Sequence, residues 1–180
     1  MRLTEEDARA RLTAARVARL ATTGADGQPH LVPVTFAVDG ELIYVAVDHK
    51  PKTTVNLRRL RNIRENPRVA VLADHYAQDW DTLWWVRADG RASVMSAEDA
   101  IRRPLDLLAA RYEQYREDRP EGPVIVIRVQ RWTGWSSQSR LTSRDSGVPG
   151  TARKSIVLKI EPVIAGQTFS TNWILVFISG

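Results

Sequence analysis

Apolar and polar positions alternate with a period of two along much of the chain up to residue 138, which predicts β-strands with one buried face. Runs rich in β-branched and aromatic residues carry this alternation, over residues 17–24, 30–38, 41–48, 68–75, 82–88, 91–95 and 123–135. Asp-Gly pairs follow three of these runs, at residues 26–27, 39–40 and 89–90. This dipeptide favours a type I′ turn, in which both central residues need a positive φ. The pattern therefore predicts antiparallel hairpins.

Three segments change to the period of an α-helix. Residues 4–16 have Thr4 as a candidate cap and acidic residues in the first turn, where they favour the helix dipole. Residues 51–66 predict a second helix that begins at Pro51, because proline suits the first helical turn. Residues 97–116 predict a third. The fold is therefore expected to be mainly β with flanking helices.

The character of the chain changes at about residue 139. The following stretch, "SRLTSRDSGVPGTARKS", is rich in Ser, Gly and Arg and is typical of a linker. The apolar end of the chain is interrupted by charged residues and proline, so it does not predict a membrane span. We expect one domain over residues 1–138 and an extension of open role over 139–180, either a non-native segment or added strands that cover a sheet edge.

The composition limits the class of protein. The chain has 180 residues, no cysteine and a net charge of +5, with a pI of about 10.0. The missing thiols exclude disulfides and thiolate metal sites. A high pI is compatible with nucleic-acid binding, but much of the positive excess lies in residues 139–180, so we expect no nucleic acid. The charged start of the chain does not resemble a signal peptide, and a cytoplasmic protein is expected.

Lysine is rare and localised in this sequence. Residues 1–138 contain nineteen arginines and two lysines, and Lys50 and Lys52 flank Pro51 at the entrance of the predicted second helix. A helix N-terminus attracts anions, and lysine suits a phosphate as a compact point charge. Thr53 could add a hydroxyl, and Asn56 is placed by the helical period on the inward face. The alternative is an ordinary solvated helix start.

Together, "KPKTTVNLRRLRNIRENPRV" and "DWDTLWWVRADGRA" resemble the split β-barrel flavin-binding family related to pyridoxamine phosphate oxidase. More narrowly, they resemble the branch of probable actinobacterial oxidoreductases that depend on coenzyme F420, a deazaflavin. The resemblance covers about residues 4–137. It implies an FMN-binding type of split β-barrel that forms a homodimer, with the cofactor at the subunit interface.

The resemblance also implies which residues bind the cofactor. The strand before the second helix and the helix entrance would hold the phosphate, through Val47, Asp48, Lys50, Lys52 and Thr53, with Asn56 nearby. The second strand would lie along the ring system, through Val32, Pro33 and Val34. A tryptophan-bearing segment of the other subunit would supply a wall, through Trp80 and Trp85. Core or interface packing is the alternative role for each tryptophan.

Other chemistries have little support in the sequence. His30, His49 and His75 are the only histidines and have no metal-binding spacing, so no metal is expected. No nucleophile is paired with a base, so catalytic residues stay unknown. The leading prediction is an F420-dependent oxidoreductase that transfers a hydride to or from an unidentified small organic substrate. The alternatives are an FMN-dependent flavin reductase or oxidase, and a cofactor carrier without turnover.

Overall fold

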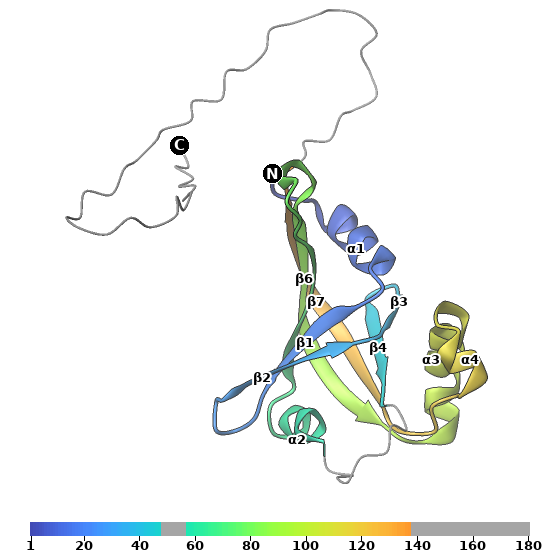
Figure 1. The fold of residues 1–180 in the computed structure, drawn as a ribbon. Coiled ribbons are helices and arrows are strands. Elements are labelled where there is room, and N and C mark those ends of the chain that lie inside the picture. The colour runs from blue at the N-terminus through green and yellow to red at the C-terminus, as the bar shows by residue number, and fades with distance from the viewer. Residues whose placement is uncertain (48–56, 138–180) are drawn as a thin grey trace, which may run out of the picture. The chain divides into compact units, whose positions relative to one another are not determined.

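The computed structural model describes residues 1–47 and 57–137, which form an antiparallel sheet with helices packed against it (Figure 1). The residues predicted as an extension, 139–180, lie outside the described part of the chain. The described strands are β1 (Ala18–Thr23), β2 (Pro29–Val34), β3 (Ala37–Asp39), β4 (Leu42–Ala46), β5 (Arg68–His75), β6 (Trp84–Met95) and β7 (Val124–Ser136). The helices are α1 (Glu5–Ala14), α2 (Arg58–Glu65), the 3-10 helix η1 (Trp80–Thr82), α3 (Glu98–Arg111) and α4 (Gln114–Glu117). None of these helices is long and apolar enough to cross a membrane.

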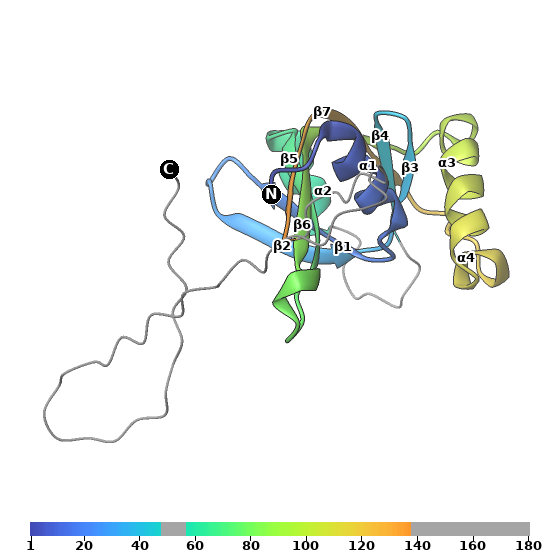
Figure 2. The ribbon, with the colours of Figure 1, turned by 90° about the horizontal axis from the view of Figure 1, so that it is seen from above.

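The seven described strands follow the order β2-β1-β5-β6-β7-β4-β3, so β2 and β3 lie at opposite edges of the sheet. Only Thr35 and Phe36 separate these two strands in the chain. In a flat sheet, six strand spacings of about 4.8 Å would hold the edges roughly 29 Å apart. Three Cα steps cover at most about 11 Å. The connection therefore requires a sheet that curls until its edges meet, which is a split barrel (Figure 2).

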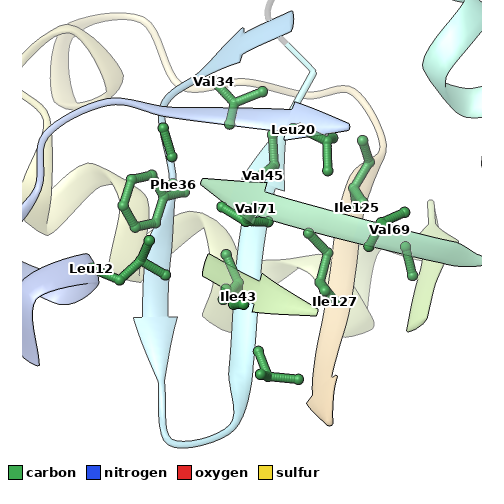
Figure 3. Packing of buried hydrophobic residues seen from close by; sticks show 14 of the residues in the cluster. Leu12, Leu20, Val34, Phe36, Ile43, Val45, Val69, Val71, Ile125 and Ile127 are labelled. Atoms are coloured by element: carbon green, nitrogen blue, oxygen red, sulfur yellow. The ribbon is translucent and has the colours of Figure 1, made fainter. Parts of the chain in front are cut away.

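The barrel interior is filled by the inward residues of the alternating strands. Leu20, Ile43, Val71 and Ile127 have no exposed surface, and Figure 3 shows them facing one another from four strands. α1 closes one side of this core with Leu12. Thr4 caps α1 by accepting a hydrogen bond from the backbone N–H of Asp7, as the sequence predicts. The period-two pattern therefore gives the correct inner face.

A second apolar cluster lies where α3 and α4 cover β3 and β4. Tyr112, which follows α3, is the central contact of this layer. Its hydroxyl group accepts a hydrogen bond from the Phe36 N–H at 3.1 Å and lies 2.8 Å from the Arg16 carbonyl oxygen. The hydroxyl group of Tyr115 in α4 is hydrogen-bonded to the Thr35 hydroxyl, with 2.7 Å between the two oxygen atoms. The helices thus fix the short link between the two sheet edges.

Two of the three predicted turns are confirmed, and one is wrong. Gly27 and Gly40 have positive φ values of 70° and 60° in the β1–β2 and β3–β4 hairpins. Gly90, however, lies inside the continuous strand β6, at a β-bulge against β7. A Cβ at Gly90 would lie 2.4 Å from the Arg128 carbonyl oxygen. This glycine is therefore required by a close approach of two strands.

Two predicted boundaries are also corrected. Residues 30–38 are divided between β2 and β3, because the chain crosses from one sheet edge to the other at Thr35 and Phe36. The helix predicted over 97–116 is interrupted at Tyr112, whose extended backbone (φ −123°, ψ 123°) separates α3 from α4. The apolar period continues across this break, because both helices pack on the same cluster.

Candidate functional site

The structure describes six of the eleven residues predicted to bind a cofactor. Val32, Pro33 and Val34 lie on β2, Val47 directly follows β4, Trp80 lies in η1 and Trp85 on β6. The other five lie outside the described residues: Asp48, Lys50, Lys52, Thr53 and Asn56. Their predicted roles therefore stay predictions.

The second helix begins later than predicted. α2 starts at Arg58, and Leu57 before it has extended backbone angles (φ −67°, ψ 129°) and no side-chain capping bond. Pro51 and the two lysines lie outside the described residues, so their predicted place at a helix entrance stays a prediction.

The described residues on either side of segment 48–56 contact the rest of the fold. The Val47 N–H donates a hydrogen bond to the Pro123 carbonyl oxygen at 3.1 Å. Leu57, at the other end, packs against the main core and accepts hydrogen bonds from the N–H groups of Leu60 and Arg61. Val47 is therefore attached directly before β7, and Leu57 is attached at the first turn of α2.

α2 is attached to the β1–β2 hairpin by polar side chains. Asn62, with 2% of its surface exposed, donates to the Thr22 hydroxyl at 3.1 Å, and Asn66 donates to the Thr23 hydroxyl at 3.0 Å. Glu65 accepts a hydrogen bond from the Ala25 N–H at 3.0 Å. Consequently α2, the helix that follows the lysine segment, is hydrogen-bonded to the hairpin that contains β2, the strand predicted to hold the ring.

The three residues predicted on the second strand alternate between its two faces. Val32 and Val34 lie opposite Leu20 and Ala18 and face the interior, whereas Pro33 is exposed on the outer face. Because β2 is an edge strand, one side of its backbone has no strand partner among the described residues. β2 therefore has a backbone edge without a strand partner among the described residues, an exposed Pro33 on its outer face and two valines on its inner face.

His30 on β2 is a polar residue that the sequence analysis considered only as a metal ligand. It lies opposite Thr22, and its Nδ1 atom is buried without a hydrogen-bond partner among the described residues. Burial lowers the pKa of His30, and the nearby Arg58 and Arg59 lower it further. A neutral imidazole with an unsatisfied nitrogen beside α2 can hydrogen-bond to a ligand. The sequence contains one signal for the position of this side chain: His30 alternates with Val32 and Val34, so all three lie on the inner face of β2.

The two predicted tryptophans occupy different environments. Trp80 lies at the tip of the β5–β6 hairpin and is 53% exposed. Trp85 is half-buried on the outer sheet face, opposite Trp135 of β7. Trp84 faces the other way, stacks with His75 and lies under the Arg11 guanidinium group. The predicted opposite orientation of Trp84 and Trp85 is confirmed.

The described residues contain no cluster of three or more His, Asp or Glu side chains that could hold a metal ion. Their polar groups at β2 and α2 are instead hydrogen-bonding amides, hydroxyls, guanidinium groups and one neutral imidazole. Such groups suit an organic ligand with several polar atoms and a negative charge.

A curled antiparallel sheet with flanking helices defines this protein as a split β-barrel. Residues 4–136 match the family model described as pyridoxamine 5'-phosphate oxidase, and the chain belongs to this family. A solved structure of an FAD-binding protein from Mesorhizobium loti has the same fold, with a TM-score of 0.59 and 24% identity. That likeness covers 74% of this chain and 95% of the other.

Two relatives are reductases. An F420H2-dependent biliverdin reductase from Mycobacterium tuberculosis is 33% identical over 125 residues, which are 69% of this chain and 82% of the relative. A 5a,11a-dehydrotetracycline/5a,11a-dehydrooxytetracycline reductase from Streptomyces rimosus is 34% identical over 87 residues, 48% of this chain. The match spans 60% of that second relative's length.

Proposed function

We propose that this protein is an F420-dependent oxidoreductase that transfers a hydride between the reduced deazaflavin and a small organic substrate. The F420H2-dependent reductase from Mycobacterium tuberculosis supports the choice of cofactor. The observation in this chain that carries the proposal is the attachment of α2 to the β1–β2 hairpin. It joins the helix that follows the lysine segment to β1 and to the turn that leads into β2, which supports one site for both a phosphate and a ring.

Each part of the proposed site has a separate task. Lys50, Lys52 and Thr53 bind the phosphate, with Val47, Asp48 and Asn56 beside them. The β2 edge, with Pro33 exposed and the two valines beneath, orients the ring. His30 offers its buried nitrogen as a hydrogen-bonding group from the same strand. The bound cofactor supplies the hydride chemistry, and the protein binds, orients and excludes water.

The proposed enzyme is a homodimer, with Trp80 and Trp85 of one subunit forming a wall for the cofactor of the other. The outer sheet face supports this arrangement. It carries Leu31, which is 64% exposed, and half-buried Trp85 and Trp135, while the apolar cluster under α3 and α4 involves β3, β4 and the adjoining ends of β6 and β7. Another copy of the chain would remove these apolar groups from water.

A titration of the purified protein with F420 and FMN, side by side, tests the cofactor. We expect tighter binding of F420, followed by oxidation of F420H2 when an acceptor is added. Tighter FMN binding, with a yellow protein as isolated, would instead favour the flavin-dependent alternative that the FAD-binding structure illustrates. Tight F420 binding without oxidation across an acceptor panel would favour a carrier.

A further inference from the structure

Three arginines form a row across the outer face of the sheet. Arg68 on β5 lies directly opposite Arg91 on β6, and Arg91 lies directly opposite Arg128 on β7. Residues directly opposite in an antiparallel pair point to the same face, and all three side chains are exposed. Neighbouring strands are about 4.8 Å apart. The three guanidinium groups therefore come from adjacent positions on a rigid surface.

Other arginines on this face contact carboxylates, whereas the row has no such contact among the described residues. Arg19 contacts Asp74 at 2.6 Å, and Arg87 contacts Asp89 at 2.9 Å. Asp89 is also 3.6 Å from Arg131. Among the described residues, no carboxylate forms an ion pair or hydrogen bond with the side chains of the row. Because like charges directly opposite each other destabilise a sheet, the ligand-free row has an energetic cost.

The bulge at Gly90 creates this row. Before the bulge along β6, Asp89 lies opposite Arg131. After the bulge, Arg91 lies opposite Arg128. Without the one-residue shift, Arg91 would be opposite Val129, which is instead buried in the core. β-bulges commonly redirect side chains near functional sites. Here the bulge aligns two cations that a regular ladder would separate.

We propose that Arg68, Arg91 and Arg128 form a binding site for a small oligoanion with adjacent phosphate or carboxylate groups. Guanidinium groups bind both kinds of anion through paired hydrogen bonds. Three cations on neighbouring strands fit a compact ligand with several negative groups, and such a ligand removes their mutual repulsion. This site uses none of the residues of the proposed cofactor site. It shares the outer sheet face with Leu31, Trp85 and Trp135, so it requires that the proposed homodimer leaves the row open.

Calorimetric titration with two probes tests the proposal. Tripolyphosphate presents adjacent phosphates and citrate adjacent carboxylates, so the tighter probe identifies the preferred group. We expect saturable binding of at least one probe, a loss of about tenfold in affinity for Arg91→Gln, and weaker binding at high salt. Arg102→Gln is the matched control, because it removes one exposed charge from α3, away from the row.

Anions could also bind at Lys50 and Lys52, and Lys52→Ala separates the two sites. The proposal requires that the affinity lost in Arg91→Gln is retained in Lys52→Ala. It is overturned if neither probe binds, if Arg91→Gln binds like the wild-type protein, or if only Lys52→Ala loses affinity. Sedimentation supplies a further test. If Arg91→Gln changes the assembly state but not the anion affinity, the row belongs to a protein interface and the oligoanion site is refuted.

Discussion

Asn62 and Thr22 form a buried hydrogen bond that joins a helix to a strand: the Asn62 side-chain amide donates to the Thr22 hydroxyl at 3.1 Å, and each residue is 2% exposed. The bond fixes α2 against β1 at the level of His30, which lies opposite Thr22 on β2. A polar contact in the interior is costly to break, because its groups cannot turn to water.

Asn62→Ala is therefore expected to lower the free energy of unfolding by about 1–3 kcal/mol. The substitution removes the donor and leaves the Thr22 hydroxyl buried without it. Urea denaturation measures the loss. Asn66→Ala, at the partly buried Asn66–Thr23 bond, is the control and should cost less. Equal losses for both variants would contradict a special role of the buried pair.

Gly90→Ala should be strongly destabilising, because the new methyl group would overlap the Arg128 backbone. We expect a loss of about 2 kcal/mol or more in urea denaturation. Gly27→Ala provides a comparison, because a Cβ there meets nothing within 4 Å and only the positive φ is unfavourable. That change should cost about 1 kcal/mol. A reversed order would show that the bulge relaxes easily.

The stability of the protein should fall as the pH drops below the ordinary pKa of histidine. His30 has a lowered pKa in the folded state, so the unfolded chain binds a proton at a higher pH than the folded chain. Protonation therefore favours unfolding at acidic pH. The contribution of neutral His30 to the free energy of unfolding is fully present only above about pH 6.5 and is lost as the pH falls. His30→Asn should reduce the loss of stability between pH 7.5 and pH 5.5.

An NMR titration of the His30 ring gives an independent measurement. Its pKa should lie below the ordinary value, mainly because of burial, and Arg58→Gln should raise it by removing a nearby positive charge. An unshifted pKa would indicate that the imidazole is open to water. In that case the buried Nδ1 atom would not be an available group in the candidate site.

Lys52→Ala should weaken cofactor binding about tenfold, if this lysine contacts the phosphate, with little change in the melting temperature. Fluorescence titration with F420 measures the first effect and thermal denaturation the second. Arg64→Ala, an exposed residue near the end of α2, is the control for loss of one positive charge. Equal cofactor affinities for the wild-type protein and Lys52→Ala would refute the phosphate assignment.

Much of the fold follows from local signals in the sequence. The two Asp-Gly hairpins and the Thr4 cap are confirmed because each depends only on neighbouring residues. The turn predicted at Asp89-Gly90 is wrong because its glycine serves a contact between distant strands. The division of residues 30–38 was missed for a similar reason. Only the complete sheet order shows that the chain changes edges there.

The candidate site was less predictable than the fold. The rarity of lysine singled out Lys50 and Lys52, which lie outside the described residues, and the described helix α2 begins at Arg58. The predicted ring residues alternate between faces, which a period-two pattern already implies for Val32, Pro33 and Val34. The Arg68–Arg91–Arg128 row depends on strand pairing and a bulge, and neither can be read from spacing along the chain.

The two-residue link at Thr35 and Phe36 has a consequence for strand registration. A slip of β2 along β1 would move the link, and the link would pull β3 along β4. The pairing of the β1–β2 hairpin is therefore coupled to that of the β3–β4 hairpin, although β2 and β3 are not neighbours in the order of the described strands. A register error in the hairpin that supports α2 is consequently opposed by strands on the far side of the sheet.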